Sequence, residues 1–211
     1  MTQELLPNIY KVYRDQSSDG WGYSTLVKRP QGNILFARMG KGASIADEYA
    51  AIEALGGIER IYITDYHFAG EHVEDVAQRF HASIYCAQVE AAKIRKQGSR
   101  TLTTFDYAVH DLEPGLTVIP SPGHTSGGVC YRLTLAGKRY LFTGDLLYFD
   151  GDQWIVGTKN YAKVKDTLAR LQALEVDYLV GCGDDALGCP YLEFTPDTKA
   201  AFFDRIARSF D

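Results

Sequence analysis

The chain has 211 residues, of which 45% are hydrophobic, and a net charge of -5 at pH 7. A chain of this length forms one large domain or two small ones with an ample core. Its net negative charge and the lack of a Lys/Arg cluster disfavour nucleic acid as a partner. No run approaches the roughly 18 apolar residues of a membrane span, and the N-terminal stretch lacks the features of a signal peptide, so we expect a cytoplasmic protein that does not contact membranes.

The first half of the chain alternates strand and helix patterns. The turn residues 29–33 join two strand patterns into an antiparallel hairpin. Ser44 begins a capping box that predicts a helix to about Leu55, where Gly56 and Gly57 end it. The predicted strands of this half are 9–13, 23–28, 34–37, 58–63 and 83–86, and the predicted helices are 44–55, 71–80 and 88–96.

Beyond Ser99 the pattern is richer in strands and ends in helices. The predicted strands are 116–119, 129–135, 139–143 and 178–180, and the predicted helices are 161–174 and 196–208. Hairpins come first in each half and helices follow them. This order predicts an α/β fold, in which two mixed sheets pack face to face with helices outside, as one domain over residues 1–211.

Four cysteines are too few and too scattered for a disulfide framework in a chain of this length. Cys86 and Cys130 lie in apolar, strand-like runs and are expected to be small core residues. Cys182 and Cys189 lie in a glycine-rich loop. For them we expect an ordinary loop role, although either could be reactive or could contact a site.

Polar motifs stand where apolar strand patterns end. Asp65 and His67 follow one strand, and residues two apart at a strand end point to the same face. His124 follows strand 116–119, and Asp145 follows strand 139–143. Two histidines and two carboxylates that meet at one sheet edge form a plausible divalent metal site. The alternative is that Asp65 caps a turn and the histidines are ordinary surface residues.

Two of these motifs carry a family resemblance. Ser121-Pro122-Gly123-His124-Thr125-Ser126-Gly127 and Phe142-Thr143-Gly144-Asp145 resemble two signatures of the metallo-β-lactamase fold superfamily, which includes glyoxalase II-like hydrolases. Their order and spacing match, and the resemblance covers nearly the whole chain. It implies an αββα sandwich of two mixed sheets flanked by helices.

The resemblance also shows where this chain departs from the family. The family's first metal loop reads Thr-His-x-His-x-Asp-His, whereas residues 64–70 keep only the second histidine, His67, and place Asp65, Ala69 and Gly70 at the other ligand positions. A last family histidine corresponds to Gly183. The implied site therefore holds one divalent ion, or none. Two carboxylates favour manganese or ferrous iron, and zinc also fits. The implied ligands are Asp65, His67, His124 and Asp145.

If the protein is an enzyme, the resemblance implies a hydrolase of a small ester, thioester or lactone, in which the ion polarises a carbonyl and activates water. Asp145 or His72 would orient or deprotonate that water. His72 lies in the first turn of helix 71–80, and we expect its side chain to point toward the cleft. The alternative is that His72 faces solvent. The alternative function is a metal-free pseudoenzyme that binds a ligand or protein partner in the former active-site cleft. The substrate and the oligomeric state remain open.

Overall fold

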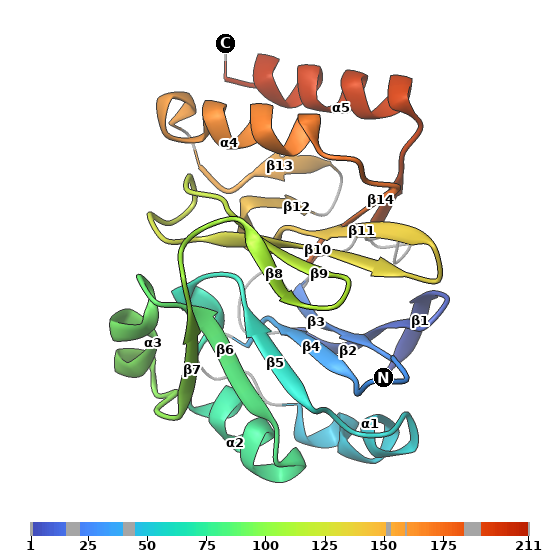
Figure 1. Cartoon of the computed structure of the whole chain (residues 1–211), viewed down its shortest axis with the longest axis vertical. Coiled ribbons are helices and arrows are strands. Elements are labelled where there is room, and N and C mark those ends of the chain that lie inside the picture. The colour runs from blue at the N-terminus through green and yellow to red at the C-terminus, as the bar shows by residue number, and fades with distance from the viewer. Residues whose placement is uncertain are drawn as a thin grey trace.

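The strands of the described residues pair into two large mixed sheets (Figure 1). A computed structural model describes residues 2–15, 22–39, 45–150, 153–158, 160–183 and 191–210. In the first sheet the strands pair in chain order: Gln3–Leu6 (β1), Ile9–Asp15 (β2), Gly22–Val27 (β3), Ile34–Ala37 (β4), Arg60–Ile63 (β5), Ser83–Ala87 (β6) and Leu102–Phe105 (β7). The pairs from β1 to β4 are antiparallel and those from β4 to β7 are parallel.

The second sheet has the order β15-β14-β11-β10-β9-β8. Its strands are His110–Glu113 (β8), Leu116–Pro120 (β9), Val129–Leu135 (β10), Lys138–Phe142 (β11), Tyr178–Val180 (β14) and Tyr191–Glu193 (β15). The β11–β14 pair is parallel and its neighbours are antiparallel. A separate hairpin consists of Leu147–Phe149 (β12) and Trp154–Val156 (β13).

Helices cover the outer face of each large sheet (Figure 1). Tyr49–Ala54 (α1), Glu71–Phe80 (α2) and Ala91–Gln97 (α3) lie against the first sheet, and Tyr161–Ala173 (α4) and Pro196–Arg208 (α5) lie against the second. The result is the predicted order of layers: helices, sheet, sheet, helices. The prediction of an αββα sandwich is confirmed.

Three apolar layers hold the sandwich together because each sheet is apolar on both faces. Ile61 on β5 and Val73 on α2 belong to the layer under the first sheet. Between the sheets, the rings of Phe36 on β4 and Phe142 on β11 stack with centroids 4.1 Å apart. The third layer joins the second sheet to α4 and α5. Cys86 and Cys130 are fully buried in these layers, as predicted.

The predicted capped helix at 44–55 is only partly correct. Ala46–Glu48 forms a short 3-10 helix, α1 begins at Tyr49, and no side chain caps either start. Ser44 of the expected capping box lies outside the described residues. None of the helices in the described ranges has the length and apolar character needed to cross a lipid bilayer.

Candidate metal centre

Four side chains that the sequence placed at strand ends come together between the two sheets. Asp65, His67, His124 and Asp145 each offer one ligand atom, and these atoms all lie within 4.8 Å of one another. Asp65 follows β5, His124 lies in the loop between β9 and β10, and Asp145 follows β11. Loops at strand ends thus build the cluster, as is common in layered α/β folds.

Asp65 and His67 meet through a turn rather than through an extended strand end. Asp65 is the extended N-cap of the 3-10 helix Tyr66–Phe68, and its Oδ1 accepts a hydrogen bond from the His67 backbone N–H at 2.9 Å. The same oxygen lies 3.2 Å from His67 Nδ1. This hydrogen bond raises the pKa of His67 above its usual value, against the effect of partial burial. Asp65 is 4% exposed, so it depends on such partners.

His124 presents one ring nitrogen to the cluster and uses the other to hold its orientation. Nδ1 lies 2.6 Å from the carbonyl oxygen of Gly157, a contact that requires the proton on Nδ1. The lone pair of Nε2 then faces the cluster, 2.9 Å from His67 Nδ1 and 3.6 Å from Asp145 Oδ2. A histidine ligand held by a backbone carbonyl in this way is typical of metal sites.

Asp145 enters the site because Gly144 permits a close approach between the sheets. Gly144 has φ +52°, and a Cβ there would lie 2.3 Å from the Thr64 hydroxyl. Burial raises the pKa of Asp145, as does the negative charge of Asp65, while Arg38 and the two imidazoles act in the opposite direction. Nearby positive charge therefore favours the ionised form of this carboxylate.

The four donors fit a single divalent cation. Three contacts between ligand atoms are 2.9, 3.2 and 3.6 Å long. Metal–nitrogen and metal–oxygen bonds of ~2.0–2.1 Å in a tetrahedral arrangement place neighbouring ligand atoms roughly 3.3 Å apart. Two carboxylates also offset both charges of the ion. The set of mixed nitrogen and oxygen donors suits zinc, ferrous iron or manganese.

His72 lies outside this group of four. Its Nδ1 contacts Asp75 Oδ2 at 3.3 Å, one turn further along α2, and a quarter of its side chain is exposed. A local carboxylate partner on the same helix face thus holds the imidazole. Of the other residues considered from sequence, Cys182 is buried with its Sγ 3.9 Å from Asp145 Oδ1, and burial raises the pKa of its thiol. Two further residues lie outside the described ranges: Cys189 and Asp184, a carboxylate that follows strand 178–180 in the sequence.

Sequence reasoning missed Arg38, whose guanidinium reaches the same cluster. Its Nη2 lies 3.9 Å from Asp145 Oδ1. The available signal was a charged residue directly after the apolar strand β4, which is parallel to β5 and ends at the same edge. No motif marked that position.

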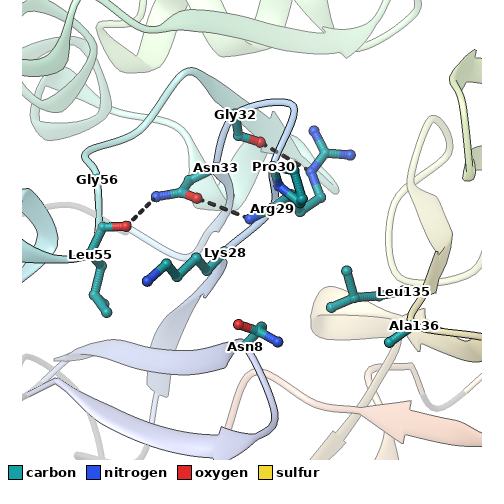
Figure 2. Close-up of a pocket in the computed structure, with 10 residues that line it drawn as sticks. All are labelled: Asn8, Lys28, Arg29, Pro30, Gly32, Asn33, Leu55, Gly56, Leu135 and Ala136. Carbon is teal, nitrogen blue, oxygen red and sulfur yellow. Dashed lines mark hydrogen bonds between the residues drawn. The ribbon is translucent and has the colours of Figure 1, made fainter.

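A cavity of about 680 Å³ lies away from the four-residue cluster, at the other end of the strands, where β4 and β11 begin (Figure 2). Part of its polar lining is already used by the fold. Asn33 accepts a hydrogen bond from the Arg29 backbone N–H and donates to the Leu55 carbonyl, as Figure 2 shows. The Arg29 guanidinium lies 2.9 Å from Glu113. We therefore place the chemistry at the four-residue cluster rather than in this cavity.

Comparisons with known proteins agree on one family. A sequence model described as the metallo-beta-lactamase superfamily matches residues 52–183. Hydroxyacylglutathione hydrolase from Rhizobium meliloti is 33% identical over 166 residues, which cover 73% of this chain and 61% of that protein. The protein of the same name from Brucella ovis is 33% identical over 168 residues, covering 77% and 62%. The chain thus spans about three fifths of the length of these relatives.

Solved structures share the fold at low sequence identity. A motif mutant of a metallo-beta-lactamase from Cronobacter sakazakii superposes with a TM-score of 0.70 at 18% identity, covering 100% of this chain and 95% of that chain. The Rm3 metallo-beta-lactamase superposes with a TM-score of 0.68 at 17% identity, covering 99% and 91%. Identities at this level speak for the fold alone.

Proposed function

The chain belongs to the metallo-beta-lactamase superfamily, and from this membership we propose that it is a hydrolase of a small ester, thioester or lactone that uses one divalent ion. The observation that carries the proposal is the meeting of Asp65, His67, His124 and Asp145 within 4.8 Å. The relatives named hydroxyacylglutathione hydrolase favour a thioester of a hydroxy acid as the first substrate to test.

Each of the four residues has a role that its surroundings support. A divalent ion supplies Lewis-acid polarisation of a carbonyl group and makes water a better nucleophile. Asp65 and His67 hold each other through the cap of the 3-10 helix, so their donor atoms are set before any ligand arrives. His124 keeps its Nε2 lone pair directed inward because Gly157 binds its Nδ1 proton. Asp145, beside both imidazoles, is the carboxylate that we propose orients the attacking water.

The opening of the site lies on the His67 side. The side chain of His67 is 40% exposed, compared with 23% for His124 and 15% for Asp145. A small substrate can therefore reach the imidazole edge while the carboxylates stay shielded. Shielding strengthens the electrostatic interactions of the carboxylates with a cation.

A second candidate, a metal-free protein that binds a ligand in the same cleft, is favoured by one observation. His124 Nε2 and His67 Nδ1 are 2.9 Å apart, which is also the length of a hydrogen bond. With one proton between them, the two rings satisfy each other without a cation. In that case the cluster would be a hydrogen-bonded group rather than a set of ligands.

Metal content and hydrolysis measured together separate these candidates. Protein purified without chelator is assayed for bound metal and for hydrolysis of a hydroxyacylglutathione, an aryl ester and a lactone. It is then stripped with a chelator and reloaded with zinc, ferrous iron or manganese. The proposal expects about one ion per chain and hydrolysis that is lost and regained with the ion. Protein that binds no ion under any of these conditions and hydrolyses none of these substrates would favour the second candidate, the metal-free ligand-binding protein.

A further inference from the structure

The guanidinium of Arg38 lies directly beside the candidate metal centre. Arg38 follows Ala37, the last residue of β4, and Ala37 pairs in parallel with Ile63 of β5. Arg38 therefore leaves the same sheet edge as the segment that carries Asp65. Its Nη2 is 3.9 Å from Asp145 Oδ1, and its side chain is 20% exposed. The centre thus faces a fixed positive charge on one side.

The surrounding chain is built to hold this guanidinium. Arg38 Nη1 donates to the carbonyl of Cys182 at 3.0 Å, and the same carbonyl accepts from the Tyr23 backbone N–H at 3.0 Å. A Cβ on Gly22 would lie 1.5 Å from Nη1, so a larger residue there would have to displace the guanidinium. The guanidinium carbon also lies 5.5 Å from the centre of the Phe68 ring.

Arg38 thereby contacts the two chain segments at which the family resemblance places the ligands of a second ion. Phe68 immediately precedes Ala69 and Gly70, which have no ligand atoms in their side chains. Cys182 immediately precedes Gly183, which pairs with Gly22 in a β-bridge. The donors of a second ion are gone from both segments, and a cationic side chain lies against both.

We infer that Arg38 takes the place and the charge of a second cation, so that it positions Asp145 and limits the centre to one ion. The inference rests on the proposed one-ion centre. The positive charge of a guanidinium attracts a neighbouring, largely buried carboxylate and so helps to hold it in place. A second dication in the same space would meet like-charge repulsion at short range in a partly desolvated site, where such repulsion is strong.

Counting bound ions in paired variants tests the inference. Ala69→Asp, Gly70→His and Gly183→His together return the three missing donors, and a Cβ at Gly70 would make only ordinary contacts, at 3.6 Å or more. This restored-ligand protein is prepared with Arg38 intact, with Arg38→Ala and with Arg38→Lys, which keeps the charge. Elemental analysis is expected to give about one zinc per chain with Arg38 or Lys, and about two with Ala.

A second measurement needs no restored ligands. In the otherwise unmodified protein, Arg38→Ala leaves Asp145 without the cationic side chain that positions it. The zinc affinity measured by calorimetry should therefore be roughly tenfold lower in Arg38→Ala than in Arg38→Lys. The zinc-induced rise in melting temperature should also be smaller in Arg38→Ala. Equal affinities and equal melting-temperature gains in the two variants would overturn the role of the charge.

The outcomes also distinguish this inference from the proposed function. Two ions in the restored-ligand protein with Arg38 intact would overturn the inference and leave the one-ion centre standing. An unchanged count of one ion after Arg38→Ala in that protein would do the same. An unmodified protein that binds neither zinc nor ferrous iron nor manganese would overturn both.

Discussion

The hydroxyl of Tyr131 donates a hydrogen bond to the carbonyl of Ile63 at 2.7 Å and so joins the second sheet to the first. Both residues are fully buried. Beside this bond, the Val129 backbone N–H donates to the Thr64 carbonyl at 2.9 Å. These two bonds fix the end of β5 against β10 immediately before Asp65. The position of the metal loop relative to the rest of the centre therefore depends on contacts between the sheets.

Tyr131→Phe should destabilise the fold by about 1–3 kcal/mol, because it leaves a buried carbonyl without its donor. Urea denaturation monitored by tryptophan fluorescence measures the change in free energy of unfolding. Tyr140→Phe is the matched control, since Tyr140 is also buried but packs by stacking on Tyr178 at 5.1 Å. Equal losses in the two variants would show that the Ile63 hydrogen bond contributes nothing of its own.

The regular elements could be predicted where burial alone dictates the pattern. Helix α2 has the predicted bounds because its apolar residues Val73, Val76 and Ala77 recur on one buried face. Strand β10 is likewise predicted to the residue. By contrast, β8 reads His-Asp-Leu-Glu, has no buried residue, and was not predicted. Its pairing with β9 supplies the strand geometry, and such tertiary pairing leaves no local signal.

Some residues of the candidate site could likewise be predicted from sequence, and others could not. Asp65, His67, His124 and Asp145 follow strands or stand in motifs, so sequence brings them to one edge, where the structure gathers them. Arg38 depends on the space that Gly22, distant in sequence and on another strand, leaves for its guanidinium. Neither residue resembles a motif. A side-chain position of this kind depends on three-dimensional packing rather than on any local pattern.

Loss of either imidazole from the cluster should abolish tight metal binding. His67→Ala and His124→Ala each remove one donor from a set of four. Loss of a residue that only supports a ligand lowers metal affinity by about 10–100-fold, so loss of a ligand itself should lower the zinc affinity by more than that. Calorimetric titration of chelator-treated protein measures it. His72→Ala is the matched control, since His72 pairs with Asp75 instead, and it should keep the metal. A comparable loss in His72→Ala would return His72 to the centre.

Acid should weaken the parallel contact between β11 and β14 through Asp177. Asp177 accepts hydrogen bonds from the backbone N–H, Nε and Nη2 of Arg139, and these bonds lower its pKa. Because the folded pKa lies below the unfolded value of about 3.9, the stabilisation is present above about pH 4. It is lost as the pH falls through the folded pKa.

Asp177→Asn should therefore lower the free energy of unfolding at pH 7, and the difference from the unmodified protein should shrink toward zero below about pH 3. Denaturant titrations at several pH values measure this. Asp166→Asn, at an exposed position on α4, serves as the control and should show little difference at any pH. A difference that stays constant from pH 7 to pH 3 would mean that the Asp177 charge is not the stabilising feature.

Gly157 should prove as important to metal binding as some of the ligands, although it offers no side chain. Its carbonyl accepts the Nδ1 proton of His124, and a Cβ on Gly157 would lie 1.9 Å from the Asp145 carbonyl oxygen and 2.7 Å from His124 Nδ1. Gly157→Ala must therefore move β13 away from the loop that carries Asp145, or rotate the His124 ring. Either movement separates the donors. We expect zinc affinity to fall by about 10–100-fold, as when the partner that orients a histidine ligand is lost.

The matched control for Gly157→Ala is Gly70→Ala, the same substitution close to the metal loop. A Cβ on Gly70 meets its nearest atoms at 3.6 and 3.7 Å, which is ordinary contact. This variant should bind zinc as the unmodified protein does, with an unchanged melting temperature in the absence of metal. If Gly157→Ala keeps full zinc affinity while Gly70→Ala does not, then the orientation of His124 by the Gly157 carbonyl does not set the geometry of the centre.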